Sequence, residues 1–148
     1  MTNGALAMVD RAFLWPMVAQ VGLVAIVWVS LYRARLTEMK VRRIRPDAVA
    51  TSRMAATALE NVAAADNFRN LFELPVLFFA ACLALAVTGL GSPLLVGFAW
   101  AYVALRAVHS FIHITYNRVV HRFFAYTAST LCLYVMWILF AVNLARSA

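Results

Sequence analysis

Four long stretches of the chain contain almost no charged residue, and this pattern restricts the possible folds more than any other feature. The stretches are residues 13–32, 71–88, 94–115 and 123–144, and Glu73 and Arg106 are the only charged residues inside them. A helix that crosses a lipid bilayer needs about 20 mostly apolar residues, each adding about 1.5 Å to its length. Because backbone groups in lipid must satisfy their own hydrogen bonds, we predict four membrane-spanning helices.

The composition agrees with a membrane protein. Of the 148 residues, 65% are hydrophobic and 13% are charged. A soluble domain of this size exposes a large part of its surface and could not bury so much apolar area. The connections that follow the second and third stretches are short, and short connections make neighbouring helices antiparallel. We therefore predict one all-α domain over residues 1–148, an up-down bundle of four transmembrane helices.

Basic residues are concentrated in the connections that lie on one side of this bundle. Eight of the 13 Lys and Arg residues lie in the segment 33–69, and Arg118 and Arg122 lie between the third and fourth stretches. Loops rich in Lys and Arg stay in the cytoplasm, so both termini are predicted on the non-cytoplasmic side. The compact chain, rich in Ala and Arg, favours a bacterial inner membrane, although a protein of the endoplasmic reticulum would have the same topology. We expect the basic segment to set this orientation and to meet anionic lipids. Nucleic acid is not expected as a partner, because no folded basic domain accompanies the segment.

Polar side chains recur at helical spacing within the spans. Residues three and four positions apart share one face of a helix. One such stripe consists of Tyr102, Arg106, His109, His113 and Tyr116, and a second consists of Asp66, Asn70 and Glu73. A charge at the depth of Arg106 costs about 2.5–3.5 kcal/mol in lipid, so Arg106 must face a bundle interior, a subunit interface or a wet pocket. We expect Arg106 and Glu73 to share one pocket, as an ion pair that fixes helix register or as a site for an anionic ligand.

The histidine pair in the first stripe could also bind a metal or haem. His109 and His113 are four residues apart, but no third ligand has metal spacing, and Glu73 would have to serve. We therefore expect no metal and expect these histidines to act through hydrogen bonds. The two cysteines, Cys82 and Cys132, lie inside predicted spans, where we expect small core residues and no disulfide.

Two segments have a recognisable pattern, NFRNLFELPVLFF at 67–79 and WAYVALRAVHSFIHITYNRVVHRFFAY at 100–126. They resemble the MAPEG family, the membrane-associated proteins in eicosanoid and glutathione metabolism, and the chain length and four spans agree. The resemblance implies a homotrimer that holds glutathione between neighbouring subunits at the cytoplasmic side. An arginine then keeps the thiol as a thiolate, which attacks a lipophilic electrophile or reduces a lipid peroxide. A cation beside a thiol favours the thiolate, which is the nucleophile.

The resemblance also implies roles for individual residues. Those expected to be catalytic are Arg106, Arg35 and Arg33. Those expected to bind glutathione are Asn70, Glu73, Arg69, His109, His113 and Tyr116. Glu73 would hold the ammonium group of glutathione. One position departs from the family pattern, because Asp66 stands where members usually carry an arginine, and an acid there would repel a glutathione carboxylate.

Three functions follow from these observations. The first is an integral membrane glutathione transferase or peroxidase, whose partners are further copies of the chain, membrane lipids and a lipophilic small-molecule substrate. The second is a non-catalytic membrane protein of the same fold, lipid-binding or an accessory subunit, and Asp66 favours it. The third is an enzyme that uses the same pocket with another cofactor, such as a histidine-bound metal.

Overall fold

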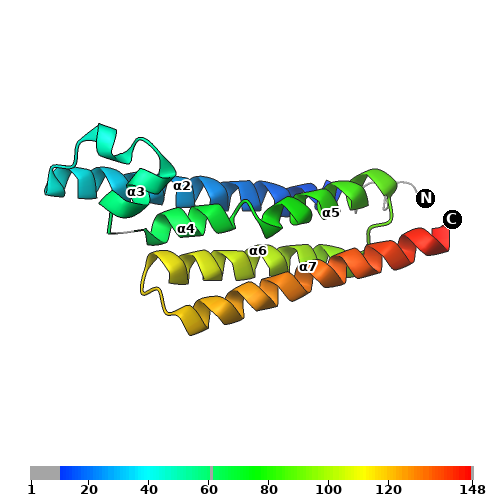
Figure 1. The fold of residues 1–148 in the computed structure, drawn as a ribbon. Coiled ribbons are helices and arrows are strands. Elements are labelled where there is room, and N and C mark those ends of the chain that lie inside the picture. Colours follow the sequence, from blue (N-terminus) through cyan, green and yellow to red (C-terminus); the bar gives the residue numbers. More distant parts are fainter. Residues whose placement is uncertain (1–10, 61, 148) are drawn as a thin grey trace.

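The computed structural model describes residues 11–60 and 62–147, and its helices form one antiparallel bundle (Figure 1). The elements are α2 (Leu14–Arg42), η1 (Pro46–Val49), α3 (Ser52–Ala58), α4 (Ala63–Asn70), α5 (Leu74–Thr88), α6 (Pro93–Ile114) and α7 (Val119–Ser147). Four helical stretches are long and apolar enough to cross a membrane: Leu14–Arg42, Ala63–Thr88, Pro93–Ile114 and Val119–Ser147. The described residues contain no strand, so the predicted all-α class and the up-down bundle are confirmed.

The apolar core lies among α2, α5, α6 and α7. Phe78 stacks on Tyr102 with ring centroids 4.4 Å apart, and Leu85, Leu95 and Met136 are buried in the same cluster. Lipid is as apolar as this core, so the cluster stabilises the bundle through close packing rather than by removal from water. Both cysteines are free, and Cys82 is part of this core.

The second span is interrupted in its N-terminal part. The sequence predicts a kink at Pro75, and the structure has a break over residues 71–73 that separates α4 from α5. Pro75 lies in the first turn of α5. In a continuous helix its ring would clash with the carbonyl group of Leu71, four residues earlier, so the helix must end before it. The break therefore follows from one residue, and it leaves α4 as a separate short helix.

The first helix is longer than its apolar stretch. The apolar run ends at residue 32, whereas α2 continues to Arg42. Residues 33–42, which belong to the predicted cytoplasmic segment, are therefore helical. Most of these ten residues favour helix. The helix ends where Arg43 adopts the left-handed conformation, with φ of 54°. Beyond it, η1 and α3 fold back beside the end of α2 (Figure 1).

Two short turns join the remaining helices. Gly89 ends α5 with a φ of 66°, and the Ser92 side chain accepts a hydrogen bond from the Leu95 amide at the start of α6. Between α6 and α7, Asn117 has a φ of 49° and accepts a 2.6 Å hydrogen bond from Arg122. The start of α2 and the end of α7 lie at the same end of the bundle (Figure 1).

Candidate functional site

Helix α4 separates two groups of polar residues near the end of the bundle that is predicted to face the cytoplasm. On the side facing α6, Asn67 is buried and accepts a 3.2 Å hydrogen bond from the Ser110 hydroxyl. On the side facing α2, Asp66 and Arg69 line a cavity. We call the first group the enclosed cluster, which consists of Asn67, Tyr102, Arg106, His109, Ser110, His113 and Tyr126. We call the second site the α2–α4 cavity.

Arg106 is the centre of the enclosed cluster and is 0% exposed. Its Nη2 donates a 2.8 Å hydrogen bond to the backbone carbonyl of Asn70, the last residue of α4. The guanidinium carbon lies 5.4 Å from the centroid of the Tyr126 ring, within range of a cation–π interaction. The Nε and Nη1 groups have no hydrogen-bond partner in the described chain. Arg106 therefore caps the carbonyl end of α4, where helix dipoles favour a cation.

The expected ion pair between Arg106 and Glu73 is not present in the described residues. Glu73 is exposed at the break in the second span, and no salt bridge joins it to another described side chain. The break over residues 71–73 explains why Arg106 has another partner. Once α4 ends at Asn70, its last carbonyls lack helical partners, and one of them accepts the Arg106 hydrogen bond.

The histidines of the cluster connect α6 with α7. The Nδ1 group of His109 donates to the backbone carbonyl of Arg122 over 3.1 Å, and the His109 ring lies 5.6 Å from the Tyr126 ring. The His113 ring lies 5.6 Å from that of His109, and both of its nitrogens are buried without a hydrogen-bond partner. Within residues 11–60 and 62–147, no group of three or more His, Cys, Asp and Glu side chains is placed to hold a metal ion.

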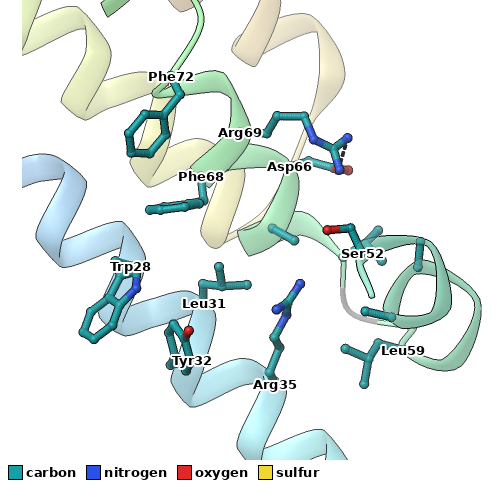
Figure 2. Close-up of a pocket in the computed structure, with 14 residues that line it drawn as sticks. Trp28, Leu31, Tyr32, Arg35, Ser52, Leu59, Asp66, Phe68, Arg69 and Phe72 are labelled. Carbon is teal, nitrogen blue, oxygen red and sulfur yellow. Dashed lines mark ion pairs between the residues drawn. The ribbon is translucent and has the colours of Figure 1, made fainter. Parts of the chain in front are cut away.

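The α2–α4 cavity has a volume of about 580 Å³ and both polar and aromatic walls (Figure 2). Arg35 points into it from α2, and its Nε is enclosed without a hydrogen-bond partner. Asp66 and Arg69 lie across the space from Arg35, with a 3.8 Å ion pair between them. The aromatic side chains that line the cavity are Trp28, Tyr32, Phe68 and Phe72. Cavities of this volume are typical of small-molecule sites.

The residues predicted for the site therefore occupy three places in the single chain. Arg35 and Arg69 line the α2–α4 cavity, whereas Arg106, His109 and His113 belong to the enclosed cluster. Asn70, at the end of α4, contacts the enclosed cluster through its backbone carbonyl. Glu73, Arg33 and Tyr116 are exposed outside both groups.

Helix geometry explains why Arg33 and Tyr116 lie apart from the others. Two residues along a helix face directions about 200° apart, so Arg33 points away from Arg35 and lines a shallow groove with Arg42 and Glu60. Tyr116 lies beyond the end of α6 at Ile114, so the predicted stripe ends at His113. Its hydroxyl lies 3.1 Å from His121 Nδ1 instead.

Three residues of this region do not stand out in the sequence pattern. Tyr126 faces both Arg106 and His109, Asn67 bonds Ser110, and the carbonyl of Arg122 accepts the His109 hydrogen bond. The spacing of Arg122 and Tyr126, four residues apart on one helix, is a signal that could have indicated a polar face on the fourth span. The apolar pattern hides this signal because it places Arg122 in a loop, whereas α7 begins at Val119.

The α2–α4 cavity can hold a charged ligand beside an apolar one. Its polar wall carries the positive charges of Arg35 and Arg69 and the negative charge of Asp66. Two positive charges and one negative charge suit a ligand that carries more than one acidic group and an ammonium group. The aromatic wall is continuous with the apolar surface, because Trp28 and Phe72 are 48% and 56% exposed. An apolar molecule dissolved in lipid can therefore approach the same cavity.

The comparisons with known proteins agree with this architecture. The model of the MAPEG family matches residues 13–142, which is most of the chain and includes three spans in full and most of the fourth. No curated protein and no solved structure matches the chain.

Proposed function

Because the chain belongs to the MAPEG family, we propose that it is an integral membrane glutathione transferase or peroxidase that acts on lipophilic electrophiles or lipid peroxides. Glutathione binds in the α2–α4 cavity from the cytoplasmic side, and the second substrate arrives from the lipid. The proposal includes the orientation given by the basic segment, with both termini on the non-cytoplasmic side.

The charges of the cavity are the observation that carries this proposal. Glutathione has two carboxylates, one ammonium group and a thiol, and the cavity presents Arg35, Arg69 and Asp66. In this arrangement Asp66 pairs with the ammonium group, a role that the resemblance implied for Glu73. Arg69 lies 3.8 Å from Asp66 and offsets the repulsion that this acid would exert on a nearby carboxylate. The departure at Asp66 is therefore compatible with glutathione.

Arg35 is the residue we assign to the thiol. Its enclosed Nε has no partner in the described chain, so it can donate to a sulfur anion without first losing another hydrogen bond. A neighbouring guanidinium favours the thiolate over the neutral thiol. The thiolate then forms a carbon–sulfur bond with an electrophile, while the leaving group or opened ring takes up a proton. Trp28, Phe68 and Phe72 form the wall along which an apolar substrate reaches the sulfur.

The proposal extends to a homotrimer with glutathione between neighbouring subunits, as the resemblance implies. Glu73, Arg33 and Tyr116 lie outside both polar sites and are exposed in the single chain, so they are available to a neighbouring subunit. Arg106, His109 and His113 remain expected site residues in this proposal. In the single chain Arg106 supports the end of α4, whose other face lines the cavity.

The test is an ultraviolet difference spectrum of the purified protein titrated with glutathione at neutral pH. We expect a thiolate band that saturates in the parent and weakens at least tenfold in Arg35→Ala, because the stabilising cation is gone. Lys40→Ala is the matched control, since Lys40 is an exposed cation on the same helix outside both the cavity and the groove. It is expected to leave the band unchanged.

Two results would count against the proposal. No band in the parent, together with bound lipid in native mass spectrometry, would indicate a non-catalytic member. A band that survives Arg35→Ala and disappears in Arg106→Ala would assign the thiolate to the enclosed cluster instead of the cavity.

A further inference from the structure

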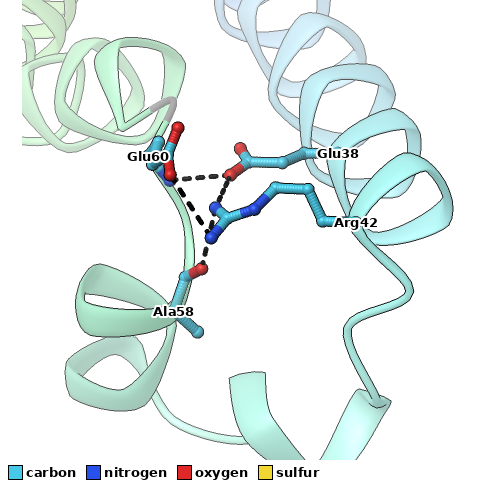
Figure 3. A network of polar contacts seen from close by, with 4 residues as sticks. All are labelled: Glu38, Arg42, Ala58 and Glu60. Atoms are coloured by element: carbon cyan, nitrogen blue, oxygen red, sulfur yellow. Dashed lines mark hydrogen bonds and ion pairs between the residues drawn. The ribbon is translucent and has the colours of Figure 1, made fainter.

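A polar network connects the cytoplasmic end of α2 to the chain that follows α3 (Figure 3). Arg42 contacts Glu38 over 2.7 Å and Glu60 over 3.3 Å, and it donates a 3.2 Å hydrogen bond to the carbonyl of Ala58. The backbone amide of Glu60 donates to the Glu38 carboxylate over 2.7 Å. We call these four residues the latch. They connect two segments that are 16 or more residues apart in the sequence.

The segment held by the latch forms one wall of the α2–α4 cavity. Ser52, Ala55, Ala56 and Leu59 line the cavity from α3 and the residue after it. Ser52 and Leu59 lie on the far side of the cavity from the rings of Trp28 and Phe72 (Figure 2). The cavity therefore has a lipid-side wall of aromatic rings and another wall that consists of α3.

This wall is attached to the rest of the protein by few apolar contacts. Ala55 is the only buried residue of α3, and Leu59 directly after the helix is 6% exposed. Met54, the largest apolar side chain of α3, is 42% exposed and does not anchor it. Thr51 and Leu59 are extended residues that border the helix on both sides, and α3 packs mainly on η1. Segments with few buried apolar contacts open locally at low free-energy cost.

We propose that η1 and α3 form a gate over the α2–α4 cavity and that the latch holds this gate closed. This inference rests on the proposed function only for the identity of the polar ligand, which is glutathione. Ion pairs between exposed side chains contribute little to stability, and Arg42 and Glu60 are 40% and 84% exposed. The closed state is thus only slightly favoured, and the gate opens without unfolding the bundle. Polar ligands enter through the gate, whereas apolar ligands enter along the aromatic wall.

The gate is tested by the labelling rate of a thiol placed inside the cavity. Ala65 lines the cavity from α4, so Ala65→Cys is introduced after Cys82→Ala and Cys132→Ala have removed the native thiols. A charged, water-soluble methanethiosulfonate is the probe, because it must enter by the polar route. We expect Arg42→Gln to label several-fold faster than the parent, since it loses the ion pairs with Glu38 and Glu60 and the hydrogen bond to the carbonyl of Ala58. Glu60→Gln, which changes only an exposed side chain, is expected to give a smaller increase.

Arg45→Gln is the matched control for the loss of a charge in the same segment. Arg45 pairs with Asp47 over 3.1 Å, both side chains are more than 80% exposed, and neither lines the cavity. We expect no change in its labelling rate. Equal rates for Arg42→Gln and the parent would overturn the proposal, and so would an equal increase for Arg45→Gln. The measurement contains no glutathione, so a failed gate and a failed glutathione site remain distinguishable. Protection of the introduced thiol by added glutathione tests the glutathione site separately.

Discussion

Arg106 illustrates how a membrane protein holds a buried cation without a carboxylate. Its partners in the described chain are the last carbonyl of α4 and the face of Tyr126. The sequence predicted that this charge faces the interior, because lipid exposure is too costly, and the structure places it there with 0% exposure. The sequence alone could not identify the Asn70 carbonyl as the partner of Arg106. That carbonyl becomes available only because α4 ends at Asn70.

Substitutions at Arg106 should show that this contact supports the fold. Arg106→Met keeps much of the side-chain volume but leaves the Asn70 carbonyl unpaired, so we expect a loss of about 1–3 kcal/mol. Arg106→Ala also creates a cavity, and we expect a total loss of about 3–5 kcal/mol. Chemical unfolding in detergent, followed by tryptophan fluorescence, measures both values. If Arg106→Ala is as stable as the parent, the contact to Asn70 is not structural.

A proline and a glycine determine where two of the helical elements end, Pro75 for α4 and Gly89 for α5. The sequence located the break in the second span to within a few residues, because a proline excludes helix for a steric reason. It ended the first helix ten residues too early, because the apolar pattern marks where lipid ends and not where the helix ends. The position of α3 against the cavity depends on tertiary contacts such as that between Arg42 and Ala58, which no local pattern reveals.

Two glycine-to-alanine substitutions should have opposite effects on stability. Gly89 has a φ of 66°, where an alanine side chain is strained, so Gly89→Ala should destabilise the protein by about 1 kcal/mol. Gly97 lies inside α6, and a Cβ atom there would meet nothing within 4 Å. Alanine favours helix by about 0.8–1.0 kcal/mol relative to glycine, so Gly97→Ala should be neutral or stabilising. Thermal unfolding of both variants in one detergent provides the comparison, and destabilisation by Gly97→Ala would contradict it.

At the scale of the whole molecule, the arrangement of the helices was the most predictable feature. Four apolar runs separated by short polar connections leave few alternatives for a chain of this length. The site was less predictable, because helical periodicity gives the residues of one face but not the helix that meets them. Tyr102, Arg106, His109 and His113 do share one buried face, as the pattern indicated. The face of α4 that carries Asp66 and Arg69 instead belongs to a separate cavity with Arg35.

The charge distribution makes a prediction for the whole molecule. If the basic segment stays in the cytoplasm, the C-terminus after Ser147 lies on the other side of the membrane. We expect a C-terminal alkaline phosphatase fusion to be active and a C-terminal green fluorescent protein fusion to be dark in a bacterial host. The same reporters inserted after Asp47 should give the reverse result. Fluorescence from the C-terminal fusion would show that the orientation is inverted.

The interruption between α4 and α5 has a mechanical consequence. A continuous helix transmits a displacement along its whole length, whereas a hinge lets one segment tilt while the other stays in place. Here α5 is fixed in the packed core through Phe78 and Leu85, and α4 is a separate helix of eight residues. The enclosed cluster includes Asn67 of α4, and the α2–α4 cavity includes Asp66 and Arg69 of the same helix. A tilt of α4 would therefore change the shape of both polar sites without repacking the core.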